Sequence, residues 1–262
     1  MNAPNKRTNT RKGATRTADI PADILDALSH GKMQTATLTE GLALDQAKLL
    51  RAAFPGLSPR ALAAADDACQ LGIVKRMAGI GAVLLEELGT EGIKQCSEHD
   101  ADTVRGWACF MIGTQTELAL PSRLEAIQPL ADDAHFGVRE WSWMAVRPHL
   151  ARELDEAIAY LTAWAVSPSE RLRRFASEAL RPRGVWCAHI TPLKQQPERA
   201  LPILSSLRAD PSTYVQDSVA NWLNDAGKDK PEWVRGLCQK WLQGEPSAAT
   251  RRICQRALRN LK

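Results

Sequence analysis

A pattern of fourteen residues occurs four times after residue 130 of this 262-residue chain. Each copy begins with Asp, Ser or Glu, continues with Pro or a small residue, and then carries apolar residues at helical spacing. An acidic residue or Ser at this place can cap the N–H groups of a helix start. The pattern therefore predicts four helices of one kind. The copies align without gaps at residues 133–146, 167–180, 210–223 and 245–258.

Successive copies begin 34, 43 and 35 residues apart. This spacing is typical of HEAT and armadillo repeats, in which each repeat contains paired helices. Second helices are predicted between the copies, at residues 154–166, 199–207 and 231–242. Because a helix pair cannot cover its own apolar face, such pairs stack into a superhelix with a concave surface. We therefore predict an all-α fold, a solenoid of HEAT-like helix pairs.

The chain before the repeats also has helical spacing, but its helices diverge from the repeat pattern. Pro55-Gly56 breaks one helix, and Ser58-Pro59 is typical of the start of the next. Residues 1–18 contain almost no large apolar side chain, so they cannot bury enough surface to offset chain entropy. We predict a disordered basic tail at 1–18 and a single domain at 19–262, with divergent helices at 19–130 and recognisable repeats at 131–262.

Charge is distributed unevenly along the chain. Residues 1–17 carry five Lys and Arg and no acid, residues 18–138 carry nine basic and seventeen acidic residues, and residues 139–262 carry twenty basic and thirteen acidic residues. A basic half suggests a polyanionic partner. Solvated helix faces are the alternative interpretation.

The remaining composition suggests a cytosolic protein without a cofactor. We find no apolar run long enough for a membrane helix and no apolar segment of a signal peptide. The six Cys are scattered without a CxxC, which favours reduced thiols, several of them in the core. The five His show no ligand spacing, so we expect surface or loop positions for them, and no metal, nucleotide or flavin.

One stretch suggests chemistry beyond packing. Arg174 and Glu178 are four residues apart, so they share a helix face and can pair. Arg181 and Arg183 flank the helix-ending Pro182, and Trp186 follows in a loop. A carboxylate held by Arg beside further Arg and a Trp suits a cationic planar group near phosphates. A surface salt bridge and a packed Trp remain the alternative.

Two segments resemble the AlkC-type DNA alkylation repair glycosylases. Residues 172–186 are similar to the family motif VRRLASEGxRPRLPW. Residues 201–225 are similar to LPILExLKDDPSxYVRRSVANNLND, and residues 227–231 continue the match. Both motifs occur in order, and the resemblance is close over residues 138–260. The family fold is a solenoid of HEAT-like repeats.

The resemblance implies cleavage of the N-glycosidic bond of alkylated bases such as 3-methyladenine in double-stranded DNA. It implies Glu178 and Asp225 as catalytic carboxylates, which would stabilise positive charge on the sugar or orient water. Trp186 and Arg174 would contact the cationic lesion. Three further arginines would contact DNA; these are Arg147, Arg181 and Arg183.

One position departs from the family pattern. Trp143 stands where the family motif SEFAIRPF has an active-site Glu, although it could still contact the substrate. Glu140 lies about one helical turn earlier and is a candidate replacement for the lost carboxylate. Trp141 and Trp143 are spaced by two, so one could be in the core while the other is exposed.

Three functions remain open at this point. The first is a monomeric DNA glycosylase, acting at the bacterial nucleoid in the cytoplasm without a membrane or a metal. The second is a DNA-binding protein of the same fold without catalysis. The third is a protein-binding scaffold. Arg on the concave face would favour the first two over the third, and excision of a base would distinguish the first from the second.

Overall fold

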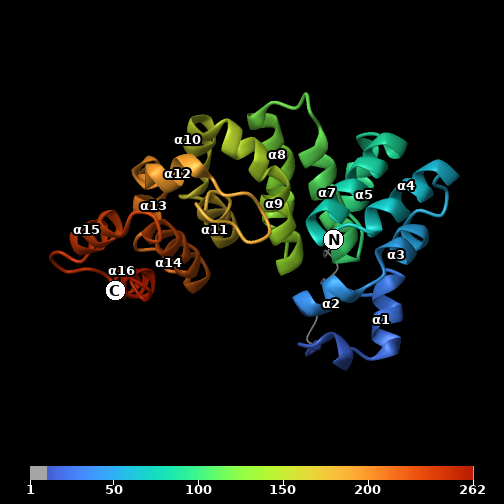
Figure 1. Cartoon of the computed structure of the whole chain (residues 1–262), viewed down its shortest axis with the longest axis horizontal. Helices are drawn as coiled ribbons and strands as arrows, with labels where there is room; N and C mark the ends of the chain where they lie inside the picture. The colour runs from blue at the N-terminus through green and yellow to red at the C-terminus, as the bar shows by residue number, and fades with distance from the viewer. Residues whose placement is uncertain (1–10, 262) are drawn as a thin grey trace, which may run out of the picture. The chain divides into compact units, whose positions relative to one another are not determined.

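The computed structural model describes residues 11–261, and every regular element within them is helical (Figure 1). The predicted all-α fold is confirmed. Contacts divide the chain into two compact units, residues 1–115 with 135–141 and residues 116–134 with 142–262. The sequence predicted one domain that changes character near residue 130. That organisation stays a prediction. The two contact units divide near residue 115, and helix α9 (Phe136–Arg152) contributes residues to both.

The first unit is built from short helices followed by two longer ones. Helices α5 and α7 pack closely because residue 81 has no side chain: a Cβ on Gly81 would lie 2.9 Å from the Cβ of Phe110. Ser58 caps α4 as predicted, because its side chain accepts from the N–H of Ala61. The elements are the 3-10 helix η1 (Thr17–Asp19) and α1 (Ala22–Ser29), α2 (Leu38–Ala43), α3 (Gln46–Ala53), α4 (Pro59–Cys69), α5 (Ile73–Leu88), α6 (Glu91–Ser97) and α7 (Asp102–Thr114).

Residues 11–18 are held against the first unit rather than disordered. Arg11 donates to both carboxylate oxygens of Glu40, at 2.7 and 2.6 Å, and the backbone N–H of Ala14 donates to the same carboxylate. The side chain of Glu40 is fully buried. Low apolar content predicted disorder up to residue 18, but one buried carboxylate gives these residues a polar anchor. Residues 1–10 of the predicted tail lie outside the described residues.

His135 lies in the loop before α9, within the expected surface or loop positions, but it is buried there. Its Nδ1 accepts from the N–H of Gly137 at 3.1 Å, so Nε2 carries the proton and donates to the carbonyl oxygen of Thr35 at 2.7 Å. Asp102 accepts from both the N–H and the hydroxyl of Thr35 at 2.8 Å. These bonds fix the loop before α2 to the start of α7 and α9.

The second unit contains the predicted repeats. Three helices, α11, α14 and α16, stack side by side and carry the second, third and fourth copies of the pattern (Figure 1). The other helices of the pairs lie near the predicted positions. The elements are α8 (Leu120–Ala131), α9 (Phe136–Arg152), α10 (Leu154–Trp164), α11 (Glu170–Glu178), α12 (Thr191–Gln195), η2 (Pro197–Ala200), α13 (Leu201–Leu207), α14 (Thr213–Gly227), α15 (Pro231–Trp241) and α16 (Ala248–Ala257).

The starts of the second and fourth copies cap their own helices, and the start of the third copy binds the second copy. The N-cap is the Ser two residues after the leading residue, as at Ser169 and Ser247. The leading Asp210 accepts from the N–H of Ser212 at 2.9 Å and from Nε of Arg173 in the copy before at 2.6 Å. The recurring turn therefore fixes how neighbouring repeats stack.

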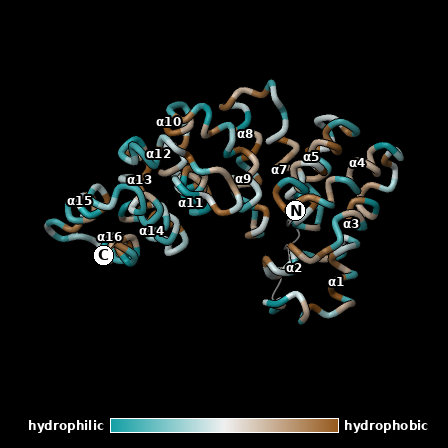
Figure 2. Tube along the Cα trace, in the orientation of Figure 1, coloured by the Kyte–Doolittle hydropathy of each residue, from teal (hydrophilic) through white to brown (hydrophobic). Residues whose placement is uncertain are grey.

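Figure 2 shows hydrophilic stretches interrupting the hydrophobic ones along the helices. Within residues 11–261, no helix has both the length and the apolar character needed to cross a membrane. Four of the six Cys are buried, as expected for thiols that fill the core.

Candidate functional site

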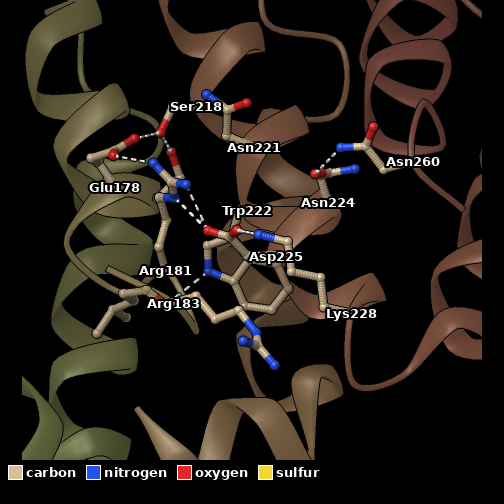
Figure 3. Close-up of polar contacts among 12 residues, drawn as sticks. Glu178, Arg181, Arg183, Ser218, Asn221, Trp222, Asn224, Asp225, Lys228 and Asn260 are labelled. Carbon is tan, nitrogen blue, oxygen red and sulfur yellow. Dashed lines mark hydrogen bonds and ion pairs between the residues drawn. The ribbon is translucent and has the colours of Figure 1, made fainter. Parts of the chain in front are cut away.

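Two carboxylates of adjacent repeats are brought together through one guanidinium (Figure 3). Glu178 ends α11, and Asp225 lies in the last turn of α14. Arg181, just after α11, donates from Nη1 to Glu178 at 2.8 Å and from Nη2 to Asp225 at 2.6 Å. The two predicted catalytic residues, 47 positions apart in sequence, are thus joined by a residue predicted to bind DNA.

Glu178 is held on both oxygens by buried groups. Its Oε1 accepts from Arg181, and its Oε2 accepts from the hydroxyl of Ser218 at 2.7 Å, with Nη2 of Arg174 at 3.5 Å. Burial pushes the pKa of Glu178 up, but the charges of the two arginines and the hydrogen bonds outweigh it, so the pKa lies below its ordinary value. Glu178 is therefore ionised at neutral pH although only 5% of its surface is exposed.

The guanidinium of Arg181 is in turn held by the two carboxylates. Burial lowers its pKa, but Glu178 and Asp225 raise it more, so the net shift is upward. Its side chain is 16% exposed. A contact with a DNA phosphate would compete with these bonds, so the role in this structure is to join the carboxylates.

The two oxygens of Asp225 have different partners. Oδ2 accepts from Nε and Nη2 of Arg181, at 2.9 and 2.6 Å. Oδ1 accepts from Nζ of Lys228 at 3.0 Å, and Lys228 is the C-cap residue of α14, three residues later. Lys228 is 49% exposed, whereas the side chain of Asp225 is 6% exposed. The buried side of Asp225 is therefore fixed by Arg181, and its outer side faces a lysine.

Arg147 lies in the interior rather than on a surface that could face DNA. It is 2% exposed, and burial lowers its pKa. It donates to the carbonyl oxygens of Ala179 at 2.7 Å, Arg181 at 2.6 Å and Ala188 at 3.2 Å. Arg147 thus satisfies carbonyls at the end of α11 and fixes the backbone of Arg181.

Arg174 and Arg183 also have partners within the fold. Arg174 pairs with Glu178 as its spacing predicted, and its guanidinium lies 5.0 Å from the ring centroid of Tyr214. Arg183 donates two hydrogen bonds to Asp229, at 3.0 and 2.9 Å. Arg183 retains 29% exposure, which leaves part of the guanidinium accessible.

Trp186 lies at the surface in a loop after α11. It is 47% exposed and has φ 60°, a left-handed conformation that is strained for a bulky residue. The loop is closed by a hydrogen bond of 3.0 Å from the N–H of Ile190 to the carbonyl oxygen of Pro182. The prediction of an accessible Trp is therefore consistent with the position of Trp186.

The departure at Trp143 places an indole in the core. Trp143 is 2% exposed and Trp141 is 8% exposed, so both rings are buried and neither is the exposed member of the pair. Glu140 is half-buried and belongs to the first unit, whereas Glu178 and Asp225 belong to the second. Glu140 as the replacement for the lost carboxylate stays a prediction.

Sequence reasoning missed two residues that complete the site, Ser218 and Lys228. Ser218 lies on the face of α14 that carries Asp225, seven residues before it, and Lys228 is the C-cap residue of α14, three residues after Asp225. Helical spacing from Asp225 could have identified them. Among residues 11–261, no group of three or more His, Cys, Asp or Glu is arranged to hold a metal ion.

Comparison with known proteins finds a similarity to DNA repair enzymes over the residues that carry this site. Residues 137–261 match the family model for DNA alkylation repair enzymes. The uncharacterized protein YhaZ of Bacillus subtilis is 40% identical over 122 residues, which are 47% of this chain and 33% of that protein. The chain thus matches about a third of the length of this relative.

Solved structures show the same architecture. The alkylpurine DNA glycosylase AlkC of Pseudomonas fluorescens, bound to DNA containing an abasic site analog, superposes with a TM-score of 0.67 and 25% identity, covering 90% of this chain and 62% of AlkC. AlkD2 from Streptococcus mutans has a TM-score of 0.60 and 22% identity, covering 77% of this chain and 97% of AlkD2. Residues 137–261 are therefore similar to the DNA alkylation repair enzymes, and the fold of the chain is similar to those of AlkC and AlkD2.

Proposed function

We propose that this protein binds double-stranded DNA along the concave side of its repeats and hydrolyses the N-glycosidic bond of cationic alkylated bases. The observation that carries the proposal is the pair Glu178 and Asp225, held by the single guanidinium of Arg181. The family match spans both carboxylates, and the AlkC structure contains DNA with an abasic site analog.

The chemistry of the lesion suits such a site. An N-alkylated purine already carries the positive charge of a good leaving group, so it needs little acid catalysis. Breaking the bond to the base builds positive charge on the sugar, and a carboxylate fixed in place stabilises that charge without reorganising. The same carboxylate could orient the attacking water. The low pKa of Glu178 keeps negative charge in the site at neutral pH.

Excision from methylated duplex DNA tests the proposal. We expect the wild type to release a methylated base, and Asp225→Asn to lower the rate by about 10² or more, since a preorganised charge is lost. Asp217→Asn is the matched control, because Asp217 lies on the same helix but is 41% exposed and pairs with Arg252 and Arg256. If the wild type releases no base, or if both variants lose activity equally, the proposed enzyme is wrong.

A binding function without catalysis is the second candidate. It is favoured by the buried Trp143, which stands where the resemblance expects a Glu. In that case the wild type would release no base but would bind methylated duplex more tightly than unmodified duplex. Equal binding of both duplexes would exclude this candidate as well.

A further inference from the structure

We propose that the ammonium group of Lys228 occupies the position beside Asp225 that a positively charged group of the ligand occupies when the ligand binds. This inference rests on the proposed function, because it requires a cationic ligand at the carboxylate pair. It assigns different roles to the two carboxylates and gives Lys228 a role in selecting charge.

The geometry leaves one displaceable position around the two carboxylates. Oδ2 of Asp225 is fixed by two hydrogen bonds from Arg181, whose side chain is largely buried. Oδ1 is held by an ammonium at the end of a flexible side chain that is 49% exposed. A lysine side chain has a flexible four-carbon stem, and Oδ2 of Asp225 keeps its two hydrogen bonds from Arg181 when Lys228 moves. Lys228 can therefore leave Oδ1 without leaving Asp225 unpaired.

Glu178 offers no equivalent position. Oε1 accepts from the largely buried guanidinium of Arg181, and Oε2 accepts from the buried hydroxyl of Ser218. A ligand could reach Glu178 only by breaking one of these bonds. We therefore assign direct contact with the cationic ligand to Asp225. Glu178 becomes a positioning residue that acts through Arg181.

A lysine at this place also serves the approach of DNA. Glu178, Asp225, Arg174 and Arg181 together carry no net charge, so Lys228 makes the cluster positive toward an approaching phosphate. A neutral ligand has no charge with which to replace the ammonium. A cationic sugar or base carries such a charge, so it can replace Lys228 and pair with Oδ1 of Asp225. Lys228 thus competes specifically with positive charge.

Two matched duplexes test this competition. One contains a positively charged pyrrolidine analogue of an abasic site, and the other contains the neutral tetrahydrofuran analogue at the same position. We expect Lys228→Met to raise the ratio of the affinities, cationic over neutral, about two- to fivefold, because the competing charge is removed. Any loss of a phosphate contact affects both duplexes and cancels in the ratio. Lys230→Met, an exposed lysine two residues away, is the control and should leave the ratio unchanged.

A double-mutant cycle with Asp225→Asn locates the effect. The gain from Lys228→Met should disappear when Asp225 is already Asn, since there is then no charge to compete for. If the wild type prefers the cationic duplex but Lys228→Met leaves the ratio unchanged, the role of Lys228 is overturned and the proposed function stands. If the wild type shows no preference for the cationic duplex, the cation site at Asp225 is overturned together with the proposed function.

Discussion

Nη2 of Arg147 donates a hydrogen bond of 2.6 Å to the carbonyl oxygen of Arg181. One arginine thus fixes the backbone from which the other arginine reaches Glu178 and Asp225. Arg147 comes from α9, and Arg181 follows α11, so the bond joins consecutive repeats. The carboxylate pair therefore depends on a residue that lies outside it and is itself buried.

Arg147→Met should destabilise the protein by about 3 kcal/mol or more, because it leaves several buried carbonyl oxygens without donors. Urea denaturation followed by circular dichroism measures the change. Arg152→Met, at an exposed arginine of the same helix, should change the free energy of unfolding by less than about 0.5 kcal/mol. Similar stability of the two variants would show that Arg147 does not hold the end of α11.

The low pKa of Glu178 predicts how stability depends on pH. A carboxyl group whose pKa is lowered by folding stabilises the folded state above its unfolded pKa, near 4.5, and this contribution disappears as the pH falls through the folded pKa. The difference in free energy of unfolding between wild type and Glu178→Gln should therefore be constant at neutral pH and shrink in acid. Urea denaturation at a series of pH values measures it. A difference that grows in acid would contradict the assigned direction.

Arg11→Met should destabilise the first unit by about 2 kcal/mol or more, because Glu40 is buried and would lose its charged partner. The hydrogen bond from Arg11 is the largest cause that lowers the pKa of Glu40, so this pKa should rise in the variant. Carbon-13 NMR of the carboxyl group measures the pKa, and urea denaturation measures the stability. Lys12→Met is the control, because Lys12 is exposed and adjacent. If Arg11→Met behaves like Lys12→Met, residues 11–18 are not anchored by Glu40.

Trp143→Glu should destabilise the protein by about 3 kcal/mol or more rather than restore a catalytic carboxylate. The substitution removes a large ring from the core and places a carboxyl group where 2% of the surface is exposed. Trp143→Phe keeps an aromatic ring and should cost less. Urea denaturation and the excision assay are both needed. A stable Trp143→Glu variant with faster excision would show that this position faces the ligand.

The repeats were predictable because their signal is local. Apolar spacing and a capping turn define each helix within about fourteen residues. Helices α11 and α16 lie within the second and fourth copies, and α14 begins in the third copy and runs four residues past its end. The pairing of Arg174 with Glu178 was predictable for the same reason, since four residues along a helix bring two side chains to one face.

The partners of Arg181 were not predictable from spacing, because Asp225 lies 44 residues away and only the stacking of repeats joins them. Periodicity shows which face of a helix is buried, but it does not show which polar group a buried arginine meets. Arg147 illustrates this limit, since its charge suggested a phosphate contact while its partners are carbonyl oxygens. Arg11 is a second example. The low apolar content around it suggested disorder, but Arg11 binds the carboxylate of Glu40, 29 residues away in the sequence.

The loop from Pro182 to Ile190 has consequences for how such a scaffold can diversify. Its base is tied by the bond between Ile190 and Pro182, and Arg147 bonds to the carbonyl oxygens of Arg181 and Ala188 near its two ends. The tip that carries Trp186 can therefore change in sequence or length while the helices beneath it keep their places. The loop is an exchangeable module, through which a new aromatic contact could evolve without rebuilding the frame that supports it.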